Sequence, residues 1–165
     1  MADVNASAGS RPDPAGRVLG IDLGSVRIGI ALSDPSRTVA SPHSVVRRSR
    51  DHATDHRAIL EMVRAEEVTA IVVGMPLSMS GASGPAARAA EAEIAELQTV
   101  VGSEIAVVAH DERLTTVSAE RSLGNARMKR ARRREVVDKV AAAVMLQSWL
   151  DRTLQEKSSM DATPR

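Results

Sequence analysis

Cysteine and aromatic residues are almost missing from this chain. Its 165 residues include no cysteine, no phenylalanine and no tyrosine, and only one tryptophan. Without cysteine the chain can form no disulfide, no cysteine zinc site and no catalytic thiol, which is typical of proteins of the reducing cytosol. Modules that read single-stranded RNA stack bases on aromatic rings, and this chain has almost no such platform. Any nucleic acid would therefore be bound through its phosphates and shape rather than through splayed bases.

Long hydrophobic runs are absent as well. No apolar run reaches the roughly 18 residues of a membrane span, and residues 1–16 lack the apolar segment of a signal peptide. We therefore expect a cytoplasmic protein with no membrane partner. A hydrophobic content of 43% is enough for the core of one domain. We predict a disordered N-terminal tail over residues 1–16, a folded domain over 17–152 and a flexible C-terminal tail over 153–165.

Charge is nearly balanced in total, at +1, but it is unevenly distributed along the chain. Residues 61–112 include two basic and nine acidic side chains, whereas residues 121–139 include eight basic and two acidic ones. Six of these positive charges fall within residues 127–134, directly before a predicted helix. Cations at a helix N-terminus oppose the helix dipole. Phosphate binding would explain why they are tolerated there, and a solvated loop is the alternative.

The order of the predicted elements indicates the fold. Hydrophobic periodicity predicts strands over 17–23, 26–33, 38–46, 69–74 and 104–110, and helices over 51–66, 85–101, 115–123 and 135–152. Pro42 restricts the third strand to an edge or a short element. Three hairpin-linked strands followed by helical crossovers imply a mixed sheet with helices on its faces. This is the order of the α/β ribonuclease H-like fold, with a five-stranded mixed sheet and helices on both faces.

Three acidic residues lie where a metal-dependent nuclease would need carboxylates. Asp22 and Glu112 each close a short apolar run that is typical of a buried strand, and Asp138 lies near the start of the last predicted helix. A carboxylate at such a place is costly to bury unless it is paired or bound to a cation. Two Mg²⁺ or Mn²⁺ ions roughly 4 Å apart would suit these hard oxygen ligands and activate water for phosphodiester hydrolysis.

Each acid also has a purely structural interpretation. Asp138 alone could favour the helix dipole from a position near the helix N-terminus. Asp22 alone could accept hydrogen bonds from loop amides at the end of its strand. Asp111 adjoins Glu112, and the pleat of the strand decides which of the two faces the site. The spacing of the residues leaves that choice open.

Other patterns in the sequence do not indicate a functional site. His52 and His56 are four residues apart on a predicted helix, but they lack the partner residues of a zinc site, and we expect a surface pair. The glycines of the loop over 75–84 are not followed by the Gly-Lys-Ser/Thr of a phosphate-binding Walker motif. Actin-like sugar kinases and ATPases also begin with Asp-x-Gly after a strand, but they need two such domains and about twice this length.

Four motifs together resemble a known family. They are residues 22–34 (DLGSVRIGIALSD), 72–81 (VVGMPLSMSG), 111–116 (DERLTT) and 138–150 (DKVAAAVMLQSWL). In this order they resemble the YqgF (RuvX) family of bacterial ribonuclease H-like nucleases. The resemblance implies that Asp22, Glu112 and Asp138 are the catalytic and metal-binding acids, and it favours Glu112 over Asp111.

The resemblance also implies a substrate. It implies a nuclease that trims the 5′ end of precursor 16S ribosomal RNA. A Holliday-junction resolvase acting on four-way DNA junctions and a catalytically silent RNA-binding module are the alternatives. A resolvase needs two active sites and would be a homodimer, whereas an RNA trimmer need not be. Candidate nucleic-acid contacts are two arginines beside the acids and four cations of the basic segment: Arg27, Arg113, Lys129, Arg130, Arg132 and Arg133.

Overall fold

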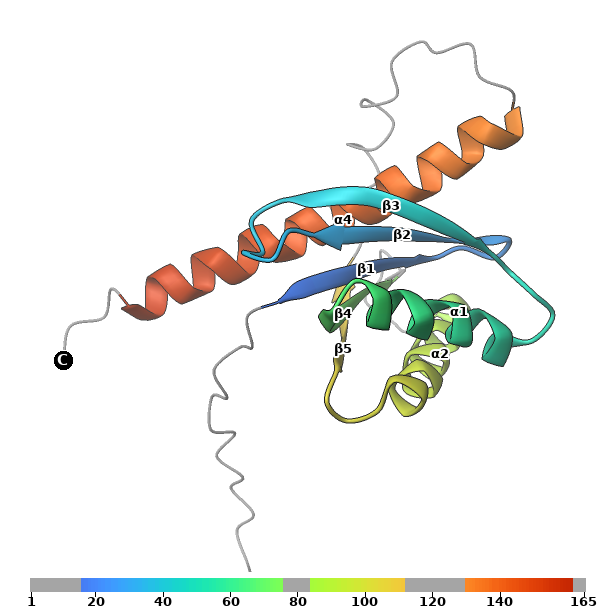
Figure 1. Ribbon diagram of the computed structural model, residues 1–165, viewed down its shortest axis with the longest axis horizontal. Coiled ribbons are helices and arrows are strands. Elements are labelled where there is room, and N and C mark those ends of the chain that lie inside the picture. The colour runs from blue at the N-terminus through green and yellow to red at the C-terminus, as the bar shows by residue number, and fades with distance from the viewer. Residues whose placement is uncertain (1–15, 76–83, 112–129, 162–165) are drawn as a thin grey trace, which may run out of the picture.

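The computed structural model describes residues 16–75, 84–111 and 130–161 (Figure 1). In chain order the elements are β1 (Arg17–Leu23), β2 (Arg27–Ser33), β3 (Ala40–Arg47), α1 (His52–Ala65), β4 (Val68–Met75), α2 (Pro85–Val101), β5 (Ala106–Asp111) and α4 (Arg130–Asp161). Within this described part, no helix is long and apolar enough to cross a membrane.

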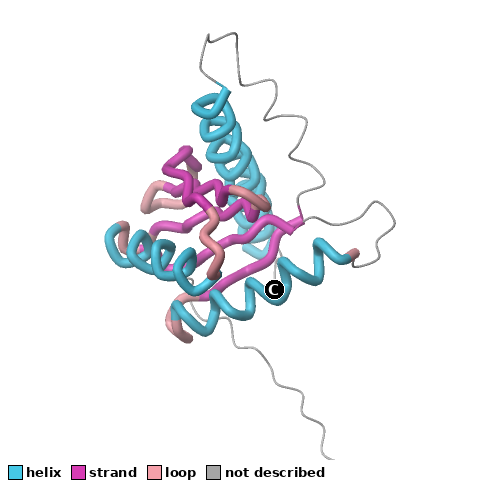
Figure 2. The backbone as a smooth tube through the Cα atoms, turned by 90° about the vertical axis from the view of Figure 1, so that its right-hand side faces the viewer, coloured by secondary structure: helices cyan, strands magenta, loops and turns pink. Residues whose placement is uncertain are grey.

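The five strands form one mixed sheet in the order β3-β2-β1-β4-β5. β1 and β2 pair antiparallel, as do β2 and β3, whereas β4 pairs parallel with both β1 and β5. Helices α1 and α2 lie on one face of this sheet and α4 lies across the other (Figures 1 and 2). The predicted five-stranded mixed sheet with helices on both faces is therefore confirmed, and Pro42 lies in the edge strand β3.

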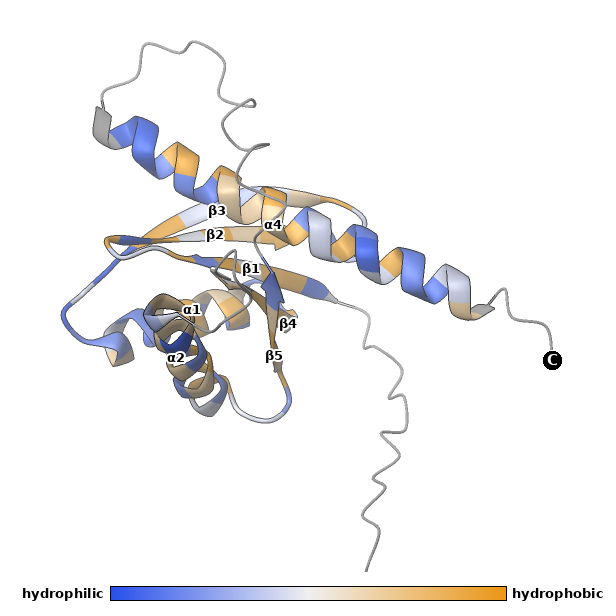
Figure 3. Ribbon diagram, turned by 180° about the vertical axis from the view of Figure 1, so that it is seen from behind, coloured by the Kyte–Doolittle hydropathy of each residue, from blue (hydrophilic) through white to orange (hydrophobic). Residues whose placement is uncertain are grey.

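Strand alternation divides the hydrophobic side chains between two cores. Leu19 and Ile21 of β1 pack in the core under α1 and α2, together with Ile59 of α1. Val18 faces the other way and packs in the core under α4, with Leu146. Figure 3 shows the strands largely in hydrophobic colours and the N-terminal end of α4 largely hydrophilic. Each face of the sheet thus has its own helical cover.

Glycine and alanine bring α4 very close to the sheet. A Cβ added at Gly20 of β1 would lie 2.8 Å from Cβ of Leu146. A Cβ added at Gly29 of β2 would lie only 2.2 Å from the main-chain oxygen of Asp138. On the helix side, Ala142 and Ala143 are buried. Only glycine lacks the Cβ that such contacts exclude, so these strand positions fix how near the helix approaches.

Helix α4 differs from its prediction in length. It spans Arg130–Asp161, whereas periodicity predicts 135–152, so residues 153–161 are helical rather than a frayed end. The apolar pattern fades after Leu150, but no glycine or proline interrupts the chain between Gly124 and Pro164. Without a breaker the helix can continue at little cost. The predicted helix over 115–123 lies outside the described residues, as do residues 1–15 of the N-terminal tail predicted over 1–16.

Candidate active site

Asp22 and the main chain of Asp138 both lie next to Gly29 on the α4 face of the sheet. Asp22 pairs with Gly29 in the antiparallel ladder of β1 and β2. Directly opposite positions of such a ladder face the same side of the sheet. The missing side chain of Gly29 leaves room for the main chain of Asp138, whose oxygen lies 2.2 Å from the Cβ position. The sheet therefore brings two acids that are far apart in the sequence to one place.

The position of Asp138 within α4 excludes the interpretation that its carboxylate serves the helix dipole. The helix begins at Arg130, eight residues earlier and more than two turns away. The favourable effect of a carboxylate on the helix dipole is confined to the first turn. Asp138 therefore owes its place to the contact with the sheet rather than to the helix N-terminus.

Arg27 supplies positive charge at Asp138. Its Nε donates a hydrogen bond to Oδ2 of Asp138 at 2.5 Å, and both side chains are partly exposed. Arg27 lies two residues before Gly29 on β2, so it faces the same side of the sheet. A guanidinium in this position orients the carboxylate and leaves further N–H groups for an anionic ligand.

The register of β5 places Asp111 on the opposite face. Asp111 pairs with Met75, and Met75 packs against Ala87 of α2. The preceding residue, His110, faces α4, where its Nε2 lies 3.4 Å from Oγ of Ser148. Asp111 therefore occupies a position on the α2 face, away from the face that Asp22 shares with α4.

The remaining predicted residues are only partly within the described structure. Glu112, Arg113 and Lys129 lie outside the described residues, and Arg130 is the first residue of α4. Arg132 and Arg133 follow it and are exposed. Among the described side chains, no group of three or more histidines or acids could hold a metal ion.

Comparison with known proteins identifies the family. A family model described as "Holliday junction resolvase" (RuvX) matches residues 16–152. This chain belongs to the RuvX family. Curated relatives from Roseiflexus sp. (strain RS-1) and Moorella thermoacetica are 44% and 46% identical, each over 82% of this chain and over 94% and 95% of the relative. A relative from Mycobacterium sp. (strain KMS) is 41% identical over 92% of this chain and 91% of its own. All three are named "Putative pre-16S rRNA nuclease".

Solved structures show the same fold. The RuvC of T. thermophilus in complex with a Holliday junction substrate superposes with a TM-score of 0.51 and 16% identity, over 84% of this chain and 96% of that one. The ribonuclease H-like fold of the RuvX chain is thereby confirmed. The names given to the family and to its relatives both describe nucleases, so the chain is a hydrolase of phosphodiester bonds, as predicted. Nucleases of this fold depend on divalent metal ions.

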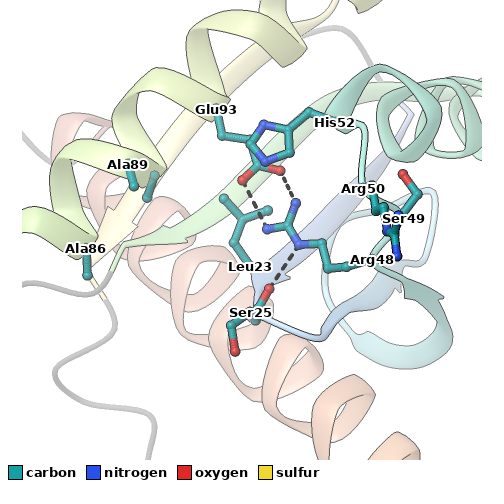
Figure 4. Close-up of a pocket in the computed structure, with 11 residues that line it drawn as sticks. Leu23, Ser25, Arg48, Ser49, Arg50, His52, Ala86, Ala89 and Glu93 are labelled. Carbon is teal, nitrogen blue, oxygen red and sulfur yellow. Dashed lines mark hydrogen bonds and ion pairs between the residues drawn. The ribbon is translucent and has the colours of Figure 1, made fainter.

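A buried ionic network that the sequence analysis missed supports the loop after Asp22 in this RuvX chain. Nε of Arg48 donates to the carbonyl oxygen of Gly24 at 3.0 Å, and Nη2 donates to Oε2 of Glu93 at 3.0 Å (Figure 4). Nη1 donates to Oε1 of Glu93 and lies 3.6 Å from Oδ2 of Asp55. One arginine thus ties the β1–β2 loop to both α1 and α2.

The electrostatics of this network favour its charged form. Burial opposes ionisation of Glu93, but the hydrogen bonds and the charge of Arg48 outweigh it, so the pKa of the Glu93 carboxyl lies below its ordinary value. His56 is 2% exposed, and its Nε2 lies 3.4 Å from Oε1 of Glu93. The expected surface pair is therefore wrong for His56, whereas His52 is exposed and pairs with Glu96.

One signal in the sequence could have revealed the network. Glu93 lies between Ala90 and Leu97, at the three- and four-residue spacing of one helical face, and both neighbours are buried. An acid within an apolar stripe must be paired, because an isolated buried charge is prohibitively costly. The same face of α2 borders a pocket of 410 Å³ beside Leu23 of β1 and Ser25 of the β1–β2 loop (Figure 4).

Proposed function

We propose that this RuvX-family nuclease cleaves phosphodiester bonds at the 5′ end of precursor 16S ribosomal RNA, using Asp22, Glu112 and Asp138 as its catalytic and metal-binding acids. The observation that carries the proposal is that Asp22 and the main chain of Asp138 both lie beside Gly29 on one face of the sheet. The names of relatives 41–46% identical to the chain support the substrate.

The donor chemistry fits Mg²⁺ or Mn²⁺. Both ions prefer hard oxygen ligands, and the acids of this site offer carboxylate oxygens. Asp22 comes from β1 and Asp138 from α4, so two separate elements converge on the site. Since Asp111 occupies a position on the α2 face, we assign Glu112 as the third acid.

The residues of the site would divide the work of hydrolysis. Two bound ions would lower the pKa of the attacking water and stabilise the leaving oxygen. Arg27 positions the Asp138 carboxylate, and its remaining N–H groups can contact a phosphate oxygen. Water attacks phosphorus and the O3′ oxygen departs, which leaves a 5′-phosphate and a 3′-hydroxyl. Arg113, Lys129, Arg130, Arg132 and Arg133 are proposed to hold the backbone of the substrate.

A four-way DNA junction is the second candidate substrate. It is favoured by the description of the family model, which names a Holliday junction resolvase. Cutting two strands of a junction symmetrically needs two active sites, so this activity requires a homodimer. The low content of aromatic residues is compatible with either substrate, because both can be recognised through phosphates and shape.

Cleavage by the wild type and by Asp22→Asn tests the proposal. Each is incubated with Mg²⁺ or Mn²⁺ and either a labelled 16S precursor RNA with its 5′ leader or a labelled four-way junction. We expect the wild type to cut the RNA and Asp22→Asn to lose at least about a hundredfold in rate, with binding retained, because the variant removes a charge that the metal needs. Circular dichroism checks that the variant is folded.

Each other outcome has a definite meaning. Wild-type rates from a folded Asp22→Asn would refute the site. Paired symmetric nicks in the junction, with intact RNA, would replace the ribosomal substrate by the junction. Tight RNA binding without cleavage under every metal condition would leave the silent RNA-binding module as the function.

A further inference from the structure

We propose that an arginine-lined pocket beside Asp138 binds the phosphodiester backbone of the substrate next to the bond that is cut. The pocket has a volume of 360 Å³ and is lined by Val26, Arg27, Arg47, Arg48 and Arg134. We call it the arginine pocket. The inference rests on the proposed function only in taking a nucleic-acid backbone as the ligand.

The strand register concentrates positive charge at this place. Arg27 of β2 and Arg47 of β3 are directly opposite each other in the antiparallel ladder. Like charges in such a pair are destabilising, so a ligand or a set of acids must compensate them. Helix α4 supplies two acids three residues apart, with Asp138 bound to Arg27 and Glu135 bound to Arg47. Arg134 adds another positive charge to the pocket wall.

Two of the four arginines are committed to the protein. Arg27 holds Asp138, and Arg48 is mostly buried and bound to Glu93 and to the carbonyl oxygen of Gly24. Both side chains also line the arginine pocket. Their charges attract an anion, but their strongest donors already have acceptors.

The other two arginines are available to a ligand. Arg47 is 78% exposed, and its 3.2 Å contact with Glu135, itself 39% exposed, is a surface pair of the kind that contributes little stability. Arg134 is exposed in the first turns of α4. A guanidinium forms paired hydrogen bonds with phosphate oxygens, and these are stronger than a solvated ion pair. Arg47 can therefore exchange Glu135 for a phosphate at small cost.

The basic surface continues beyond the arginine pocket. Arg47 also lines a second pocket of 220 Å³, together with Arg132 and Lys139 of α4. Arg47 of β3 lines both pockets, each together with residues of α4, and the ribbon shows β3 running beside α4 (Figure 1). At the mouth of the arginine pocket, Val26 is 64% exposed and offers an apolar contact to a sugar. A backbone can therefore follow β3 and α4 towards Asp138, with successive phosphates near Arg132, Arg47 and Arg134.

A double variant, Arg47→Gln with Arg134→Gln, tests the arginine pocket. Binding is measured by fluorescence anisotropy in EDTA, so that the readout does not depend on cleavage. The probes are a fluorescein-labelled RNA covering the 16S 5′ leader and a labelled four-way DNA junction. We expect Kd to rise roughly tenfold or more at 0.1 M salt. The slope of log Kd against log salt should fall by about 1.4 for single-stranded RNA and about 1.8 for duplex arms, as for two lost phosphate contacts.

Control variants distinguish the loss of contacts in the arginine pocket from a general loss of positive charge. Arg64→Gln removes an exposed arginine from α1, which covers the other face of the sheet, and should leave Kd within twofold of wild type. The double variant Arg47→Lys with Arg134→Lys retains both charges but loses the fork of donors, so it should restore the salt slope and only part of the affinity. Both altered residues are exposed, and thermal unfolding confirms that the variants are folded.

The outcomes distinguish this proposal from the proposed function. A double variant that binds both probes as tightly as wild type refutes the arginine pocket, even where the wild type cleaves RNA and Asp22→Asn does not. A loss of affinity equal to that of Arg64→Gln refutes it too. Weaker binding of both probes shows a general backbone site, and weaker binding of one shows which nucleic acid it holds. If the wild type binds neither probe, the proposed function fails and the arginine pocket fails with it.

Discussion

At the scale of single residues, Gly29 does more for the candidate site than its lack of a side chain suggests. It stands opposite Asp22 in the sheet and directly beneath the main chain of Asp138. Any side chain there would push α4 away and separate the two acids. The candidate site thus depends on the absence of a Cβ at Gly29 as well as on its carboxylates.

Replacing Gly29 by alanine should therefore damage both stability and activity. The added Cβ would meet main-chain atoms of Asp138 at 2.2 and 2.7 Å, which cannot rotate away as a flexible side chain can. Overpacking of this kind costs about 3 kcal/mol, or roughly 10 °C in Tm for a chain of this length. Gly84→Ala is the matched control, since nothing lies within 4 Å of its Cβ position. Equal Tm values for the two variants would show that α4 shifts freely.

At the scale of the elements, the Arg48 network joins the end of β3 to the β1–β2 loop and to α1 and α2. It holds Gly24, two residues after Asp22, from the side of the sheet opposite α4. Breaking a buried ion pair is costly because it leaves an uncompensated charge behind. The loop that follows Asp22 is therefore anchored by charge as well as by hydrophobic packing.

The network should make stability depend on pH in a defined direction. The pKa of Glu93 is lower in the folded chain than its ordinary value of 4.5, so its stabilising effect is complete above that value. It is lost as the pH falls from about 4.5 through the lower, folded pKa. Glu93→Gln lacks this effect and should cost about 3 kcal/mol at pH 7. The difference in Tm between wild type and variant should shrink towards pH 3. A difference that stays constant between pH 7 and pH 3 would contradict this role of Glu93.

Local patterns predicted the elements better than the contacts between them. Strand periodicity and Pro85 at a helix start give β1 and α2 with the observed bounds, and Pro42 places β3 at an edge. The burial of His56 and the face of Asp111 depend on partners distant in the sequence, which no local pattern contains. Asp22 and Asp138 could be proposed from the sequence, whereas Arg47 and Arg48 gain meaning only when β3 lies beside its neighbours.

At the scale of the whole molecule, the sheet separates two kinds of chemistry. The face under α1 and α2 holds the larger hydrophobic core and the Arg48 network. The face under α4 holds Asp22, Asp138 and the arginines of β2 and β3. The exposed arginines proposed to contact phosphate, Arg47 and Arg134, thus lie on the face opposite the larger hydrophobic core. Variants of the Arg48 network should change unfolding more than substrate affinity, and variants of the exposed Arg47 and Arg134 should do the reverse.

The C-terminal end of α4 should be dispensable for both stability and cleavage. Its buried side chains end at Leu150, which is 1% exposed, and residues 154–160 are all exposed. We expect a chain of residues 16–152, the range of the family match, to melt within about 3 °C of the full chain and to cleave at an unchanged rate. A chain ending at Gln147 is the counterpart. It removes Trp149 and Leu150 from the α4 core and should lose about 3–5 kcal/mol. Comparable losses in both shortened chains would show that residues 153–161 contribute packing that their exposure conceals.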